Sequence, residues 1–233
     1  MIEVSGVTKQ YGGERVVSDL SFSVRKGSTF GFLGQNGAGK TTTIKMLVGL
    51  ISPFSGKILI EGISPSTLSI KKKIGFMPES AYFYERLTGM EFLHFCGELF
   101  GLNKDEKYYE SIFKKLGIYE AKNKVIREYS KGMKQRLGFA QAIVNNPEYV
   151  FLDEPLDGLD PIGRREIKEI IKSLQKEGRT IFLNSHILYD IEELCDEIGI
   201  IHKGKLLYFG TINLFCSGIS LEERFIKLIE KEK

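Results

Sequence analysis

The hydrophobic and polar positions of the chain change their period several times along the sequence. Short segments that alternate or are rich in β-branched residues occupy residues 2–7, 16–24 and 57–61, and this pattern predicts antiparallel strands near the start. The compact apolar run 29–34 ends in glycine and leads into a glycine-rich turn and a helical pattern. We therefore expect a strand, a loop and a helix in succession, which is the beginning of a βα unit.

Beyond this unit the chain has a purely helical stretch before the alternation returns. Residues 87–102, 105–118 and 131–146 carry helical spacing with no strand between them. The pattern that follows predicts strands at 148–155 and 179–185, helices at 161–176 and 187–195, a hairpin around Lys203-Gly204 and a short amphipathic helix at 219–231. The expected fold class is α/β, with an α-helical insertion in the core.

Composition narrows the class of protein only moderately. Hydrophobic residues make up 42% and charged residues 27% of the 233 residues, the balance of an ordinary soluble protein. The net charge of +3 is too small to indicate a nucleic-acid partner. The cysteines are odd in number and lack metal-site spacing, so we expect reduced thiols in a cytoplasmic protein: Cys96, Cys195 and Cys216. No apolar run reaches about 18 residues, and the first residues lack the layout of a signal peptide.

The octet GQNGAGKT at residues 34–41 matches the phosphate-loop pattern in full, between a predicted strand and a predicted helix. Gly34, Gly37 and Gly39 allow backbone N–H groups to face a phosphate without obstruction from a Cβ atom. The N-terminus of the following helix favours an anion. Lys40 would bring a full charge to the β- and γ-phosphates, and Thr41 would offer a hydroxyl to Mg²⁺.

A second segment carries the chemistry that a phosphate loop needs. The apolar strand YVFLDEP at 149–155 ends in two adjacent carboxylates, and buried carboxylates usually have a cation nearby. We expect Asp153 to hold Mg²⁺ and Glu154 to act as the general base that takes a proton from the attacking water. His186 ends the next predicted strand, where it could reach the γ-phosphate.

These segments, in this order, resemble the nucleotide-binding subunit of an ABC transporter from about residue 2 to residue 212. Residues 34–41 match its Walker A motif, FLDEP its Walker B motif, and LDGLD at 156–160 its D-loop. GFMPE at 75–79 is similar to its Q-loop region, and YSKGMKQR at 129–136 to its LSGGQ signature. Tyr11 resembles the aromatic residue that stacks on adenine, and His186 the switch histidine.

The resemblance implies a P-loop NTPase (RecA-like) core with an N-terminal antiparallel β subdomain and an inserted α-helical signature subdomain. Residues 1–233 would form one ABC ATPase domain, in which 1–80 and 146–212 are the catalytic core and 81–145 the helical subdomain. Residues 213–233 would be a C-terminal helix, with no extra regulatory domain after it.

The resemblance also assigns roles to single residues. The catalytic residues would be Glu154, His186 and Lys40, and the Mg²⁺ ligands Thr41, Glu79 and Asp153. Ser130 and Gly132 would hold an ATP bound mainly to another subunit, because a helix N-terminus with a hydroxyl suits a phosphate. The remaining nucleotide contacts are expected from Tyr11, Gly34, Asn36, Gly37, Ala38, Gly39, Lys40, Thr41 and Thr42.

Several residues depart from the common family pattern. The signature has Tyr129 in place of leucine, Lys131 in place of the first glycine and Met133 in place of glutamine, while Ser130 is kept. The Q-loop carries Glu79 in place of glutamine, which keeps an oxygen ligand but adds negative charge. Both departures are similar to the branch that exports drugs, lipids, polysaccharides or sodium.

The function implied is that of an ATP-hydrolysing subunit that dimerises around two ATP molecules and drives export through a separate transmembrane subunit. It would lie on the inner face of the cell membrane, as a homodimer or with another ABC ATPase subunit. The alternative is a soluble ABC-type ATPase that acts in DNA repair, on ribosomes or in cofactor assembly. A small-molecule or nucleoside kinase would share the phosphate loop but leaves residues 129–136 unexplained.

One aromatic cluster has two interpretations. Tyr82, Phe83 and Tyr84 follow the Q-loop directly. They could pack inside the helical subdomain, or they could form the edge of a groove in which a cytoplasmic helix of the membrane subunit docks.

Overall fold

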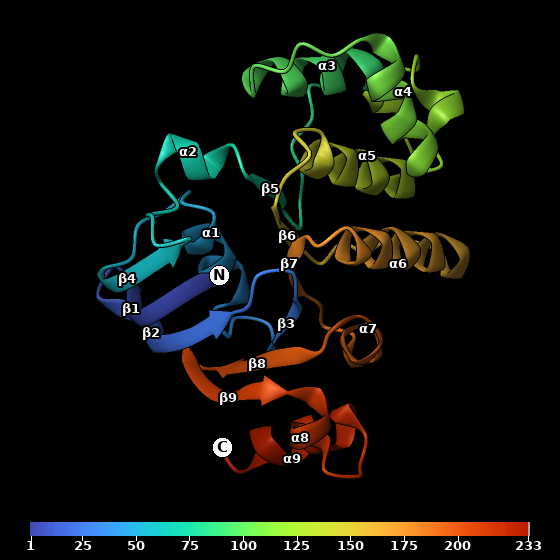
Figure 1. Cartoon of the computed structure of the whole chain (residues 1–233). Helices are drawn as coiled ribbons and strands as arrows, with labels where there is room; N and C mark the ends of the chain where they lie inside the picture. The colour runs from blue at the N-terminus through green and yellow to red at the C-terminus, as the bar shows by residue number, and fades with distance from the viewer. Residues whose placement is uncertain (233) are drawn as a thin grey trace. The chain divides into compact units, whose positions relative to one another are not determined.

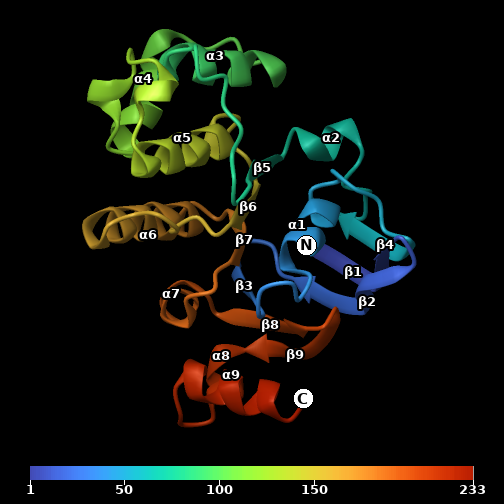
Figure 2. The ribbon, with the colours of Figure 1, turned by 180° about the vertical axis from the view of Figure 1, so that it is seen from behind.

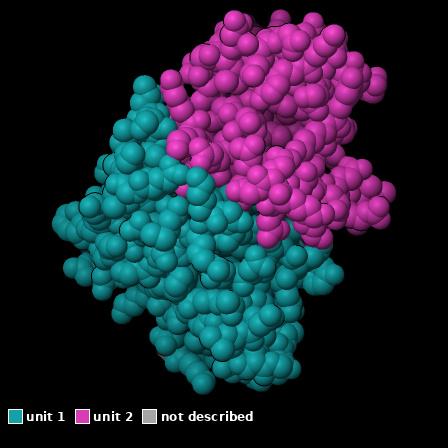
Figure 3. Space-filling view, viewed as in Figure 1, with its two compact units in different colours: residues 1–71, 180–233 teal, residues 72–179 magenta. Residues whose placement is uncertain are grey.

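The computed structural model describes residues 1–232, which fold as two compact units. Unit 1 contains residues 1–71 and the chain from residue 180 onward, and unit 2 contains residues 72–179 (Figure 3). The phosphate loop and His186 therefore belong to unit 1, whereas the signature segment and the two adjacent carboxylates belong to unit 2.

Unit 1 opens with the antiparallel sheet that the alternating segments predict. Its strands lie in the order β2-β1-β4, and their bounds are β1 Ile2–Tyr11, β2 Glu14–Val24 and β4 Ser55–Ile60. The second set of strands in this unit pairs β3 with β7 and β8 in parallel, while β9 runs antiparallel to β8. Their bounds are β3 Thr29–Leu33, β7 Thr180–Asn184, β8 Glu197–His202 and β9 Lys205–Thr211. The predicted hairpin at Lys203-Gly204 is confirmed as the β8–β9 turn.

An aromatic layer fills the space between these two sets of strands. Phe22 of β2 stacks on Phe30 of β3 with ring centroids 5.6 Å apart and nearly parallel planes. Phe182 of β7 and Phe209 of β9 pack around the same pair. Phe22, Phe30 and Phe182 are buried, so this layer forms the core on which β3 and the loop after it rest.

The helices of unit 1 are α1 Lys40–Leu47, α2 Leu68–Lys71, α7 Leu188–Leu194, α8 Ile212–Cys216 and α9 Leu221–Glu230. The C-terminal pair α8–α9 lies beside β9, as Figure 2 shows in red. Leu221 and Ile229 of α9 are buried, and Ser220 caps the helix by accepting a hydrogen bond from the Glu223 N–H. The amphipathic period of residues 219–231 thus predicts this helix correctly.

Unit 2 contains two parallel strands, β5 Ile74–Met77 and β6 Tyr149–Asp153, and the helices that were expected between and after them. The helices are α3 Gly89–Leu99, α4 Glu106–Lys115, α5 Lys131–Ile143 and α6 Pro161–Lys176, with short 3₁₀ turns at Tyr119–Ala121 and Ile126–Glu128 (Figure 1). Gly75 of β5 lets the Ala142 carbonyl of α5 approach closely, because a Cβ atom there would collide with it. All five residues of β6 are buried.

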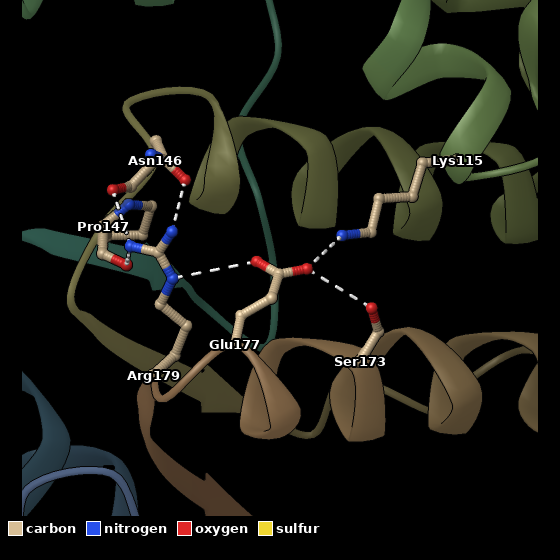
Figure 4. A network of polar contacts seen from close by, with 6 residues as sticks. All are labelled: Lys115, Asn146, Pro147, Ser173, Glu177 and Arg179. Carbon is tan, nitrogen blue, oxygen red and sulfur yellow. Dashed lines mark hydrogen bonds and ion pairs between the residues drawn. The ribbon is translucent and has the colours of Figure 1, made fainter.

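A polar network in unit 2 fixes the turn that leads into β6 (Figure 4). The Arg179 guanidinium donates to the carbonyl oxygens of Asn146 and Pro147, at 3.2 and 2.9 Å, and to the Asn146 side-chain oxygen at 2.7 Å. Glu177, after α6, pairs with Arg179 at 3.8 Å and accepts from Lys115 of α4 at 3.4 Å. The start of β6 is therefore held by the ends of α4 and α6, while the other end of β6 carries Asp153.

No helix among residues 1–232 combines the length and the apolar character that crossing a bilayer requires. The three cysteines are buried and form no disulfide. Burial raises the pKa of the Cys96 thiol to about 12 and raises that of Cys195 as well. Both thiols therefore stay protonated at neutral pH and react slowly, as structural cysteines do.

Candidate active site

The phosphate loop of unit 1 is exposed in its middle and buried at both ends. Gln35, Asn36 and Gly37 are exposed, while Gly34, Ala38 and Lys40 are buried. Gly39 caps α1 with a φ of 109°, a backbone conformation that a residue with a Cβ atom rarely adopts. A Cβ atom on Gly34 would collide with the Ile201 carbonyl of β8. The glycines are therefore required by the geometry of the loop and by its contact with β8.

Lys40 is the first residue of α1, and its side chain folds back into the loop. Its Nζ donates to the Gly34 carbonyl at 2.8 Å and to the Gln35 carbonyl at 3.3 Å. Thr43 ties the next turn down, because its hydroxyl donates to the Gly39 carbonyl at 2.8 Å. The ammonium group is thus held by two carbonyl groups of the loop at a helix N-terminus, where a positive charge and free backbone N–H groups favour a phosphate.

His186 lies beside this loop. It is exposed and follows Ser185, whose hydroxyl accepts a hydrogen bond from the Ile187 N–H at 3.1 Å. A pocket of about 250 Å³ borders both segments, and it is lined by Gly34, Gln35, Asn36, Ser185, His186, Leu188 and Phe225. The fold therefore brings the switch-histidine position to the phosphate loop. Phe225 of α9 completes the wall, and the sequence offered no signal for it beyond its place on the amphipathic face of that helix.

Tyr11 is the last residue of β1 and is half exposed. Lys9 places its Nζ 5.1 Å from the centre of the Tyr11 ring, a cation–π distance. The turn Gly12–Gly13, with positive φ at both residues, follows Tyr11 and connects β1 to β2. The Tyr11 ring therefore lies at the surface of unit 1 beside the Lys9 ammonium group. Thr41 and Thr42, at the start of α1, are half-buried.

The two carboxylates of unit 2 differ in their backbone conformation. Asp153 is the last residue of β6 and is 1% exposed. Glu154 follows with a φ of 53°, in the left-handed region, and is 9% exposed. Its carbonyl accepts hydrogen bonds from the Gln135 side chain at 2.9 Å and from the Asp157 N–H at 3.1 Å. No pattern in the sequence predicted the Gln135 contact, although Gln135 lies within the signature segment 129–136.

The signature segment begins α5 as expected. Ser130 is the N-cap, and its hydroxyl accepts a hydrogen bond from the Met133 N–H at 3.2 Å. Ser130 is exposed and Gly132 half-buried, so the first turn of the helix is open to a ligand. Tyr129, which stands where leucine is common, is buried, and its hydroxyl donates to the Ala121 carbonyl at 2.7 Å. Its burial makes Tyr129 a core residue of unit 2, and the same burial raises the pKa of its hydroxyl to about 12.

Glu79, the last candidate residue of unit 2, lies at the surface. Glu79 is exposed and follows β5 by two residues. Each residue expected to bind Mg²⁺, namely Thr41 in unit 1 and Glu79 and Asp153 in unit 2, offers an oxygen atom, which is the donor that Mg²⁺ prefers. A carboxylate as deeply buried as that of Asp153 also gains most from a cation. The donor atoms therefore fit Mg²⁺.

A protein-family model described as ABC transporter matches residues 17–157, which is more than half of the chain. The chain belongs to the ABC transporter family. This ABC protein is 48% identical over 197 residues to the ABC transporter ATP-binding protein sll0415 of Synechocystis, covering 83% of this chain and 56% of the relative. It is 45% identical over 210 residues to the bacitracin transport ATP-binding protein BcrA of Bacillus licheniformis, covering 89% of this chain and 68% of BcrA. The chain thus spans just over half of the length of sll0415.

A solved structure confirms the fold class. The ATP-binding subunit of an ABC transporter superposes on this ABC protein with a TM-score of 0.90 and 30% sequence identity, over 98% of this chain and 99% of the other. The predicted P-loop NTPase core with its antiparallel β subdomain and inserted helices is therefore correct.

Proposed function

We propose that this ABC protein binds and hydrolyses ATP as the motor subunit of a transporter. It would lie on the inner face of the cell membrane and pair with a second ATPase subunit, either a copy of itself or a different one. The pair would drive export through a separate transmembrane subunit. The observation that carries the proposal is the phosphate loop, with buried Lys40 at the start of α1 donating to the Gly34 and Gln35 carbonyl groups. Similarity to BcrA supports transport, and the departures in the signature and at Glu79 support export.

In this proposal each residue has a defined task. The backbone of residues 34–39 and Lys40 bind the phosphates, and the Tyr11 ring stacks on adenine. Glu154 takes a proton from a water molecule, whose oxygen forms a bond to the γ-phosphorus. The bond from that phosphorus to the β–γ bridging oxygen then breaks, and ADP and phosphate leave. His186 holds the γ-phosphate from the side of the pocket. Thr41, Glu79 and Asp153 would hold Mg²⁺, which would supply positive charge for the phosphate oxygens.

Nucleotide binding tests the proposal directly. Replacing Lys40 with alanine removes a charge-assisted contact, so we expect ATP to bind roughly ten- to a hundredfold more weakly. Lys45 lies exposed on the same helix and outside the loop, so Lys45→Ala is the matched control and should bind ATP normally. Titration calorimetry with ATP and Mg²⁺ measures both. ATP affinity in Lys40→Ala equal to that of the wild type would count against the site.

The aromatic cluster after the Q-loop has a divided role. The Phe83 ring packs edge-on against Phe92 of α3 at 5.3 Å, and Tyr84 packs against Phe95 at 5.5 Å. Tyr82, in contrast, is 96% exposed. Packing within the helical part of unit 2 thus accounts for Phe83 and in part for Tyr84. We propose Tyr82 as the residue that docks the membrane partner, because exposed aromatic side chains anchor interfaces.

Replacing Tyr82 with serine should shift the tagged full chain from the membrane fraction to the soluble fraction of the cells that express it natively, since an anchor is lost. Its melting temperature should not change. Phe83→Ser should instead lower the melting temperature by several degrees, because it removes a packed ring. Phe54→Ser, which also removes an exposed aromatic side chain, is the control and should stay with the membranes. Membrane association of Tyr82→Ser equal to that of the wild type would refute the docking role.

A further inference from the structure

The backbone of Glu154 has an unfavourable conformation that contacts with other residues must stabilise. A φ of 53° is unfavourable for a residue with a Cβ atom, and such conformations persist only when surrounding contacts hold them. Here the contacts converge on the Glu154 carbonyl oxygen, which accepts from Asp157 in the next turn and from Gln135 in α5. The Asp157 contact is local, whereas the Gln135 contact joins two elements 19 residues apart in the sequence.

The same end of α5 contacts the D-loop at further points. Lys131, one turn before Gln135, forms an ion pair with the Asp157 carboxylate at 2.9 Å. The stem of Lys131 lies across Gly158, where a Cβ atom would collide with it, and Gly132 faces Leu159. The Lys131–Asp157 pair is largely exposed and adds little by itself. The Gln135 contact is more sheltered, since the Gln135 side chain is half-buried and its acceptor belongs to a residue that is 9% exposed.

We propose that Gln135 is a positioning residue for the general base. Its amide N–H group holds the Glu154 peptide in the left-handed conformation and so sets the direction of the carboxylate. The signature helix, whose first turn would receive the ATP of the other subunit, is thereby connected to the catalytic carboxylate of its own chain. Closure of the signature on one ATP then adjusts the base that acts on the other ATP. This inference rests on the proposed function, in which Glu154 takes the proton from water.

Removing the donor while keeping the shape tests the role. Gln135→Glu has the same size, but its ionised carboxylate cannot donate to the Glu154 carbonyl. We expect kcat for ATP hydrolysis by the full chain to fall on the order of ten- to a hundredfold, because small displacements of a catalytic group have effects of this size. The KM for ATP should stay within about twofold, since Gln135 is not expected to touch the nucleotide. Gln135→Lys restores an N–H donor and should recover much of the rate.

Two controls separate positioning from a general loss of structure. Gln141→Glu makes the same replacement further along α5, where the side chain forms no hydrogen bond with the described residues, and should hydrolyse ATP as the wild type does. In the Glu154→Gln background, Gln135→Glu should lower the single-turnover rate no further, because it acts only through Glu154. Melting temperatures of all variants report on folding, and Gln135→Lys replaces Gln135→Glu in the double variant if the latter does not fold.

The possible results show whether the role of Gln135 fails or the proposed function fails. If Gln135→Glu keeps the wild-type kcat while Glu154→Gln is inactive, Gln135 does not position the base and the proposed function stands. If Gln135→Glu raises KM at an unchanged kcat, Gln135 acts in nucleotide binding and the inference is wrong. If Glu154→Gln itself hydrolyses ATP at the wild-type rate, the assignment of the base fails, and the inference fails with it.

Discussion

Glu154→Gln is expected to lower the rate of ATP hydrolysis by roughly 10²- to 10⁴-fold while ATP still binds. The amide that replaces the carboxylate has nearly the same shape, so the left-handed peptide and its two hydrogen bonds can persist. It cannot, however, accept the proton of the attacking water at the rate a carboxylate does. ATP-bound dimers should therefore accumulate, because the step that separates them is blocked.

The measurement combines steady-state hydrolysis with size-exclusion chromatography in the presence of ATP and Mg²⁺. Glu148→Gln makes the same change in the residue that directly precedes β6, where the carboxylate forms a surface ion pair with Lys73 at 3.3 Å. That control should hydrolyse ATP normally and lose at most about 1 kcal/mol of stability. A Glu154→Gln variant that turns over ATP near the wild-type rate would remove Glu154 from the mechanism.

A mixture of two inactive variants should regain activity if the active site is shared between subunits. Ser130→Arg places a bulky cation where the hydroxyl of the signature would meet a phosphate, but keeps Lys40 and Glu154. Lys40→Ala has an intact signature and a defective phosphate loop. In the heterodimer one composite site carries both changes and the other carries neither. Activity should therefore return in proportion to the heterodimer fraction.

This prediction depends on a chain that pairs with itself and on one intact site that can turn over alone. Because Ser130 also caps α5, its replacement costs about 1 kcal/mol of stability. Ser130→Ala loses the same cap without the bulk, so it shows how much of the defect comes from the helix itself. Ser130→Arg that hydrolyses ATP normally by itself would exclude the role of Ser130 in the neighbouring site. A mixture that forms heterodimers and stays inactive would show that Ser130 acts within its own chain or that the two sites are strictly coupled.

The local elements of this ABC protein were readable because each depends on residues close together in the sequence. The helix predicted at 161–176 is α6 with the same bounds, and Asp160 caps it by accepting from the Gly163 N–H at 2.7 Å. The phosphate loop is equally local, since its glycines, lysine and threonine lie within eight residues. The cap at Ser130 follows from a serine before a helical period. Backbone preference and short-range hydrogen bonds decide all three.

The contacts that give these elements their place could not be read in the same way. Phe225 reaches the pocket of the phosphate loop because α9 packs against α7 and α8, and α7 supplies Leu188 to the same pocket. The hydrophobic period of α9 predicts that one face of the helix is buried, but it does not predict which part of the protein covers that face. The division among Tyr82, Phe83 and Tyr84 is similar, since three adjacent aromatic residues differ only in which ring finds a partner in α3.

The sequence by itself determined most strands and helices, though not α2, β5 or α8, and it determined the phosphate loop and the helix cap of the signature, because these depend on side-chain period and local backbone chemistry. The tertiary structure alone decided that Gln135 holds the Glu154 peptide and that Tyr82 is exposed. Both depend on how α5 and α3 pack against segments that are distant in the sequence. Such packing depends on the shape and burial of side chains over the whole unit, so it cannot be predicted from a short segment of the sequence.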